Sequence, residues 1–195
     1  MRKRIALLLV PVLVLGLSGC SWLRLYGAVH DAFFSDTPEA ALSWARSHKE
    51  ELRRCGEELL GHYPDKPQWA GACFTVSVTD DGAVELWHEL SGELICFSGE
   101  DCSVLLKESA IQDVQLEPDR VCFSLGGRGF GSQTDYFEVY YIPSDDISGC
   151  FGWSPDMTFT EQDGGWFGKT DDPNDDDTFF YQEIAAHLFF CVSHF

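Results

Sequence analysis

The feature that most constrains the fold is a change in hydrophobic period near Ala72. From Ala41 to Leu59 apolar residues recur every three or four positions, as on one face of an amphipathic helix. After Ala72 apolar and polar residues alternate, which is typical of strands with one buried face. Helix first, followed by consecutive strands without a βαβ pattern, predicts an α+β fold with N-terminal helices packed on one antiparallel meander sheet.

The ends of the predicted helix are marked by capping residues. Thr37 is an N-cap residue, and Pro38 stands at the first helical position. Gly61 is expected to end the helix, and Pro64 blocks its continuation. We therefore expect one helix between these two signals.

Several short segments after the helix have sequence patterns typical of strands. Residues 73–79 and 83–90 flank an Asp-Asp-Gly turn and predict a hairpin, and residues 93–98, 104–109 and 113–117 are shorter candidates. Two further strands each place three apolar residues on one face: Val121, Phe123, Leu125 and Phe137, Val139, Tyr141. We expect 144–178 to be a long surface connection, and 178–195 to form a short helix and a last strand. This order of elements resembles cystatin-like and NTF2-like folds, a likeness that carries no function.

The first twenty residues predict export. Arg2, Lys3 and Arg4 precede an apolar run at 5–17, the order found in signal peptides. A run this short does not span the roughly 30 Å of a bilayer core. An ordinary secretory signal is the alternative, although the usual A-x-A cleavage pattern is absent.

The end of this leader, Leu17-Ser18-Gly19-Cys20, resembles the lipobox of bacterial lipoproteins. The resemblance implies cleavage before Cys20, lipid on its sulfur, and a protein anchored to the bacterial cell membrane on its extracytoplasmic face. Two or three acyl chains make a stable anchor. The predicted organisation is a signal peptide at 1–19, a juxtamembrane segment at 20–36 and a single domain at 37–195.

Charge excludes some partners. The formal charge of −19 becomes −22 when the three basic residues of the leader are removed. Nucleic acid is therefore not expected as a partner, because binding phosphates needs a basic patch. An anionic bilayer would also repel the domain, so the lipid must hold it at the membrane.

Seven cysteines remain after Cys20, an odd number, and none of them is in a CxxC pair. Cys96 and Cys102 are close in sequence and are the first pair to test for a disulfide. The alternative, which we favour, is that most of these cysteines are small buried hydrophobic residues.

A glycine-dense stretch at 125–135 raises the question of a phosphate-binding loop. Its glycine spacing fits neither common phosphate motif, and a strand follows it instead of a helix. A hairpin bend or bulge is therefore expected. Arg128 and Phe130 within the stretch are candidate ligand-binding residues, although Arg128 could instead pair with a nearby carboxylate.

An acidic run offers a candidate calcium site. Asp172, Asn174 and Asp176 fall at positions 1, 3 and 5 of a twelve-residue segment, and Glu183 falls at position 12. This pattern resembles the calcium loops of EF-hands and dockerin-type modules, in which such oxygens are ligands. Asp177 stands where those loops have glycine. The alternative is a solvated acidic loop, and no other cofactor is predicted.

Two tryptophans in glycine-rich sequence, Trp153 and Trp166, could stack on a ligand such as a sugar, or could anchor loops on the sheet. No catalytic residues can be selected, because the many thiols and carboxylates allow too many combinations. The sequence around 127–141, with a later segment at 179–184, also resembles small uncharacterised lipoproteins of Gram-positive gut bacteria, and that resemblance implies no activity.

The sequence thus predicts a non-enzymatic, lipid-anchored domain that binds an unknown surface ligand or protein. A cell-surface hydrolase acting on wall or dietary polymer and a calcium-stabilised glycan-binding module are the alternatives. A hydrolase would have a cleft in which a carboxylate or thiol is buried beside a second titrating group.

Overall fold

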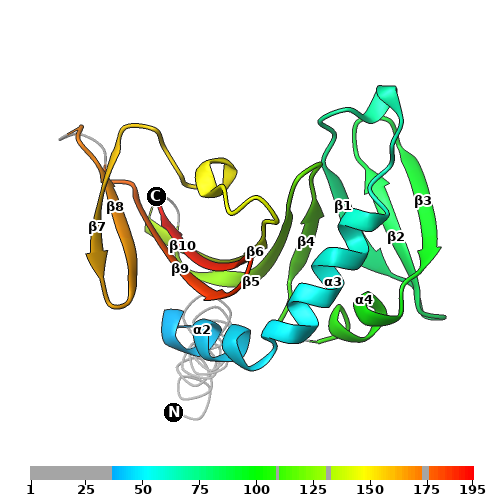
Figure 1. The fold of residues 1–195 in the computed structure, drawn as a ribbon, viewed down its shortest axis with the longest axis horizontal. Helices are drawn as coiled ribbons and strands as arrows, with labels where there is room; N and C mark the ends of the chain where they lie inside the picture. Colours follow the sequence, from blue (N-terminus) through cyan, green and yellow to red (C-terminus); the bar gives the residue numbers. More distant parts are fainter. Residues whose placement is uncertain (1–36, 109, 131–132, 173–175) are drawn as a thin grey trace, which may run out of the picture. The chain divides into compact units, whose positions relative to one another are not determined.

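The computed structural model describes residues 37–108, 110–130, 133–172 and 176–195 (Figure 1). These residues belong to one compact unit, Asp36–Phe195. Within the described part, a single ten-stranded antiparallel sheet dominates, with the strand order β3-β2-β1-β4-β5-β6-β10-β9-β8-β7. The strands are β1 Phe74–Val78, β2 Ala83–His88, β3 Glu93–Ser98, β4 Asp113–Leu116, β5 Val121–Phe130, β6 Gln133–Tyr141, β7 Met157–Gln162, β8 Gly165–Thr170, β9 Thr178–Ala185 and β10 Leu188–His194.

The predicted α+β class with a cystatin/NTF2-like order of elements was wrong. The described chain is mostly β and contains three short α-helices: α2 (Pro38–Ser47), α3 (Lys49–Gly61) and α4 (Glu100–Leu105). The expected connection at 144–178 contains β7 and β8, and the expected C-terminal helix is part of β9. These strands were missed because pairing with neighbours, which local sequence does not reveal, stabilises glycine-rich segments such as β8.

The N-terminal helical segment is capped as expected but is divided in two. The backbone N–H of Ala40 donates to Thr37 Oγ1 at 3.2 Å, and Gly61 is the last residue of α3. At His48 the backbone leaves helical geometry, with φ −111° and ψ 17°, so α2 and α3 are separate helices.

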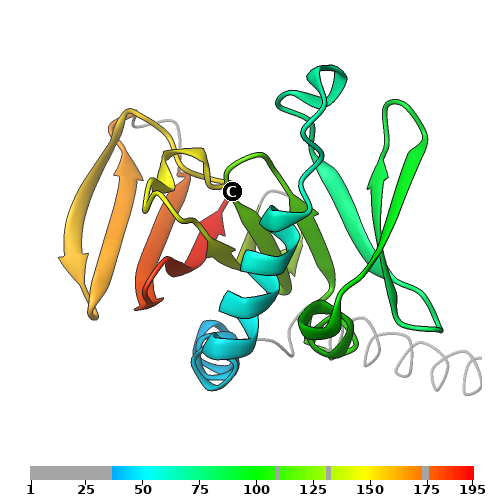
Figure 2. The same ribbon diagram turned by 45° about the vertical axis from the view of Figure 1, so that its right-hand side comes forward.

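One face of the sheet packs against all three helices (Figures 1 and 2). The alternation in β5 and β6 was read correctly, because their predicted apolar residues belong to this core. They meet the buried helix residues Ala41, Ala45, Leu52, Cys55, Leu59, Cys102 and Leu105.

The opposite face carries a second, smaller core beneath the connection that runs from β6 to β7. This connection includes the 3₁₀ helix η2 (Ile147–Gly149), and its buried residue Cys150 packs with Cys122, Phe189 and Cys191. The hydroxyl of Ser193 donates to the carbonyl of Phe151 at 2.7 Å and attaches the connection to β10. Both faces of the sheet are therefore covered at its centre, so β10 is apolar at successive positions.

Residues 1–36, which include the predicted lipobox and Cys20, lie outside the described part of the chain. In the described part, no helix has the length and apolarity needed to cross a membrane.

Candidate functional site

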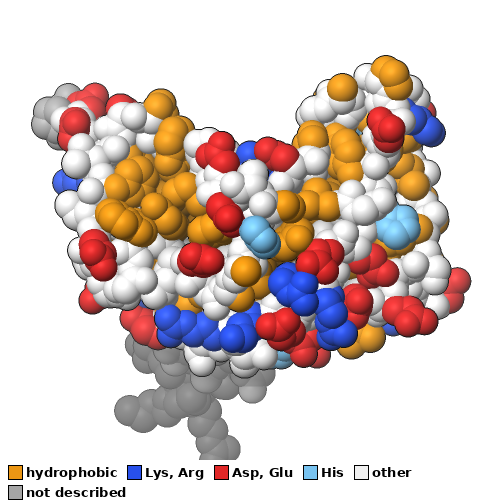
Figure 3. Space-filling view, in the orientation of Figure 1, with side chains coloured by type: hydrophobic (Ala, Val, Ile, Leu, Met, Phe, Trp, Pro, Cys, Tyr) orange, Lys and Arg blue, Asp and Glu red, His pale blue; other side chains and the backbone are white. Residues whose placement is uncertain are grey.

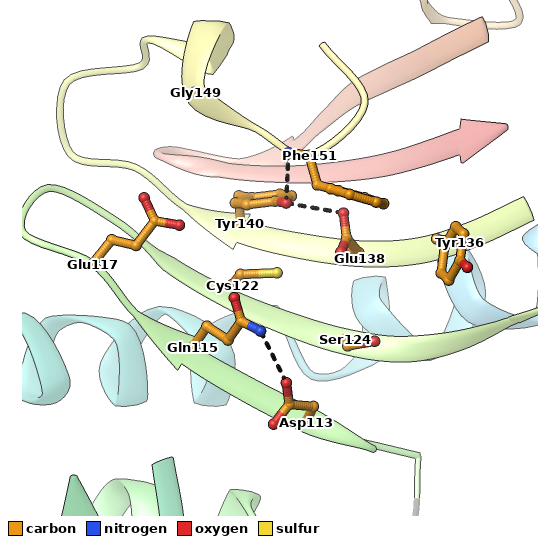
Figure 4. Close-up of a pocket in the computed structure, with 10 residues that line it drawn as sticks. All are labelled: Asp113, Gln115, Glu117, Cys122, Ser124, Tyr136, Glu138, Tyr140, Gly149 and Phe151. Carbon is orange, nitrogen blue, oxygen red and sulfur yellow. Dashed lines mark hydrogen bonds between the residues drawn. The ribbon is translucent and has the colours of Figure 1, made fainter. Parts of the chain in front are cut away.

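A pocket of about 360 Å³ opens on the sheet face opposite the helices (Figure 4). Its floor is formed by β4, β5 and β6, and one wall by the β6–β7 connection at Gly149 and Phe151. The residues from the sheet and the end of β4 are Asp113, Gln115, Glu117, Cys122, Ser124, Tyr136, Glu138 and Tyr140.

Strand alternation explains why these side chains share one face. Successive side chains of a strand point to opposite sides, so residues two apart line the same surface. In β6 the apolar Phe137 and Val139 face the helices, and the intervening Glu138 faces the pocket. The pairing of Ser124 with Glu138 then sets β5 residues beside those of β6.

Glu138 is the central polar residue of the pocket and is only 8% exposed. The hydroxyl of Tyr140 donates to Glu138 Oε2 at 2.9 Å and accepts the backbone N–H of Phe151 at 2.9 Å (Figure 4). Burial raises the pKa of Glu138 to about 7, although the hydrogen bond from Tyr140 opposes this shift. The carboxyl group thus exchanges a proton near neutral pH and is attached through Tyr140 to the pocket wall.

Cys122 and Glu117 are further titratable groups of the pocket. Burial raises the pKa of Cys122 well above its ordinary value, so this residue is a thiol and not a reactive thiolate. Burial also raises the pKa of Glu117, and Arg120 opposes that shift. The guanidinium of Arg120 pairs with Asp119 at 3.0 Å and Glu117 at 3.5 Å.

Aromatic side chains form the rim of the pocket. The rings of Tyr136 and Phe151 meet edge to face with centroids 5.6 Å apart. The ring centroid of Phe195 lies 4.9 Å from that of Phe151. Tyr136 is 38% exposed and Phe151 is 50% exposed, so both offer ring surface to a ligand.

The pocket is acidic as well as aromatic. Asp113, Glu117 and Glu138 supply three carboxyl groups, of which Glu117 pairs with Arg120 beside the pocket, and neither Lys nor Arg occurs among the described lining residues. Asp113 accepts a hydrogen bond from the Gln115 amide at 3.2 Å, which orients its carboxylate. Basic side chains gather instead along α2 and α3, on the other side of the sheet (Figure 3).

A second pocket, of about 460 Å³, lies on the helix side of the sheet. Leu42 of α2, Phe167 of β8 and Phe190 of β10 contribute to its largely apolar lining. Asp163 and Gln182 also line it, and Gln182 accepts a hydrogen bond from Arg46 at 2.9 Å. This pocket brings together fewer chemically active groups than the Glu138 pocket.

The ligand-binding residues predicted from sequence lie elsewhere. Arg128 pairs across the β5–β6 hairpin with Asp135 at 3.1 Å, which was the alternative left open for it. Trp153 packs against the second core, whereas Trp166 on β8 is 45% exposed. The side chain of Phe130 lies outside the described part of the structure. Among the described lining residues of the Glu138 pocket, none of these predicted residues occurs.

The predicted calcium ligands are spread over a loop and a strand. Asp172 and Asp176 are exposed before β9, and Asn174 lies outside the described residues. Glu183 lies within β9, five residues beyond Thr178, which corresponds to about 16 Å along a strand. Among the described residues, no group of three His, Cys, Asp or Glu could hold a metal ion. Calcium binding by this set remains a prediction from sequence.

Sequence reasoning missed Glu138 and Tyr140. The signal was present in residues 136–141, where a carboxylate falls on the face opposite three apolar residues. Nothing in that pattern shows that a connection from later in the chain covers this face and buries the carboxylate.

Comparisons of the chain with protein families, curated proteins and solved structures found no match.

Proposed function

We propose that this domain binds a small organic cation, such as a protonated amine, in the Glu138 pocket. The observation that carries the proposal is the combination of three carboxyl groups with exposed aromatic rings around one pocket. Carboxylates pair with an ammonium group, and ring faces attract it through their quadrupoles. The high negative charge of the whole chain would raise the local concentration of cations.

Calorimetric titration with matched ligands tests this proposal. Glucosamine and glucose differ by one amino group, and choline and putrescine extend the series to quaternary and paired ammonium groups. We expect the cations to bind and glucose to bind at least tenfold more weakly. Added salt should weaken binding, because a charged contact near the surface is screened.

Variants locate the site. Asp113→Asn removes one charge from the pocket and should weaken cation binding by roughly tenfold. Glu117→Gln should have a smaller effect, because the Glu117 carboxylate already pairs with Arg120. Asp156→Asn, which removes a charge from an exposed residue outside the pocket lining, is the control. Equal binding of glucose and glucosamine, or unchanged binding in both pocket variants, would refute the proposal.

We further propose that lipid on Cys20 holds the domain at the extracytoplasmic face of the bacterial membrane. The lipobox resemblance of residues 17–20 supports this proposal. Cells grown with radioactive palmitate should yield labelled protein in the membrane fraction. Cys20→Ala should abolish the label, whereas Cys73→Ala should retain it. Retention of label in Cys20→Ala would contradict the anchor.

One observation favours a hydrolase as a second candidate. Glu138 is buried in a pocket beside Tyr140 and Cys122, which is the arrangement that we expected of an enzyme. A carboxyl group with a pKa of about 7 can serve as a general acid or base near neutral pH. Hydrolysis of a panel of chromogenic glycosides and esters tests this candidate. Activity that falls at least 100-fold in Glu138→Gln would support it, and a panel without turnover would not.

A further inference from the structure

Two buried cysteines from different helices face each other in the main core. Cys55 lies on α3 and Cys102 on α4, and neither side chain has exposed surface. Their sulfur atoms are 2.8 Å apart. A disulfide bond is about 2.05 Å long, so a movement of less than about 1 Å would join them.

This pairing differs from the one that sequence spacing suggested. Cys96 is exposed on β3, where its sulfur lies 4.0 Å from Glu85 Oε1. Cys102 instead points into the core, because its backbone N–H is held by Glu58 Oε2 of α3 at 2.9 Å. This contact, made at the first turn of α4, sets the side chain of Cys102 against α3.

We propose that Cys55 and Cys102 form a disulfide that joins α3 to α4 when the protein folds in oxidising surroundings. The oxidant is a disulfide, carried by a thiol–disulfide oxidoreductase or by a small molecule such as oxidised glutathione. One cysteine thiolate attacks the oxidant and forms a mixed disulfide. The second thiolate then displaces the oxidant sulfur. The protein loses two protons and two electrons, and the oxidant is reduced to two thiols.

The surroundings of the pair decide when this reaction takes place. The hydrogen bond with Cys55 and burial both raise the pKa of Cys102, and the thiolate is the reactive form. The folded core also excludes oxidant, since both cysteines are fully buried. The bond therefore forms while the chain folds, and the folded protein then protects it from reductants.

The bond would enclose residues 56–101, which contain the three strands β1, β2 and β3. These strands form one end of the sheet. A bond between Cys55 and Cys102 would close this segment into a loop in the unfolded chain. The loop lowers the conformational entropy of the unfolded state, which is the main way in which a disulfide stabilises a fold.

Peptide mapping of the full chain tests the proposal directly. The protein is refolded in a glutathione redox buffer, denatured, alkylated without reduction and cleaved with a glutamate-specific protease. This protease places Cys55, Cys96 and Cys102 on separate peptides, 52–57, 94–100 and 101–108. We expect 52–57 joined to 101–108, with a mass two hydrogen atoms below the sum of the separate peptides.

Three further measurements complete the test. A variant with the exposed Cys73 and Cys96 changed to Ser should give the same linked peptide. The oxidised protein should melt roughly 10 °C above protein refolded with reductant. It should also keep its bond in dithiothreitol until denaturant is added. Recovery of Cys55 and Cys102 as alkylated thiols, or of Cys102 linked to Cys96, would overturn the proposal.

Discussion

At the scale of single residues, Glu138 determines how the domain should respond to pH. Its pKa is about 7 in the folded protein, above the ordinary value of 4.5, so the folded state holds this proton more tightly than the unfolded state. The stability that the protonated Glu138 contributes to the folded state is present in full below about pH 4.5 and is lost as the pH rises towards 7. We expect the free energy of unfolding to fall over this window.

The variant Glu138→Gln isolates this effect. The neutral amide removes the cost of burying a charge, so the variant should be more stable than the wild type at pH 8, by up to ~3 kcal/mol. Urea unfolding at pH 5 and pH 8 measures the difference. Glu161→Gln, a change in an exposed strand residue, controls for the loss of one negative charge. An unchanged pH dependence in Glu138→Gln would show that another group is responsible.

Tyr140 joins the sheet to the β6–β7 connection. Its hydroxyl contacts both Glu138 and the backbone N–H of Phe151, so Tyr140→Phe leaves the buried Glu138 carboxyl and the Phe151 N–H without this partner. We expect the free energy of unfolding, measured by urea denaturation, to fall by about 2 kcal/mol. Amide exchange at Phe151 should become faster. Tyr136→Phe changes a partly exposed ring at the same pocket and should have little effect on either measurement.

At the scale of elements, α3 approaches the sheet closely at Gly56. A Cβ atom built on Gly56 would lie 2.5 Å from the Tyr141 ring, whereas nothing lies within 4 Å of one built on Gly61. Gly56→Ala should therefore destabilise the protein by ~1–3 kcal/mol through overpacking. Gly61→Ala, in the same helix, should be neutral or stabilising by up to ~1 kcal/mol. Thermal unfolding compares the two, and equal effects would contradict the close packing of α3.

The glycine-rich hairpin shows how backbone geometry explains an unusual sequence. The β5–β6 register shifts between Ser124 and Gly127, and Gly126 has φ +96°. Glycine suits such a bulge because positive φ strains other residues. The predicted bulged hairpin is confirmed here, and the ion pair with Asp135 accounts for Arg128.

At the scale of the whole molecule, the last strand lies in the interior of the sheet. β10 pairs with β6 on one side and β9 on the other, so it joins β7–β9 to the remaining strands. A chain ending at His187 should fail to fold cooperatively, because both neighbours lose their partner. Removal of Phe195 alone is the control. Circular dichroism melting distinguishes the two chains, and a cooperative transition in the shorter chain would contradict this role of β10.

Local patterns predicted some elements well and others poorly. The cap at Thr37 and the alternation at Val121, Phe123 and Leu125 depend on neighbouring residues, and both were predicted correctly. The strands β7 and β8 are stabilised by pairing with each other and with β9, and Gly165 and Gly168 weaken the local strand pattern of β8. Counting them as a connection led to the wrong fold class.

By itself the sequence determined the signals that act over a few residues: the helix caps, the face of β5 and β6 that enters the main core, and the glycine bulge. Only the tertiary structure decided which residues share a site. Glu138 and Cys122 lie on different strands, and the wall over them comes from residues 149–151. Cys55 of α3 and Cys102 of α4 likewise meet, although 47 positions separate them in the chain. Such contacts depend on how distant segments pack together, and the spacing of hydrophobic residues along the sequence does not show which segments pack against each other.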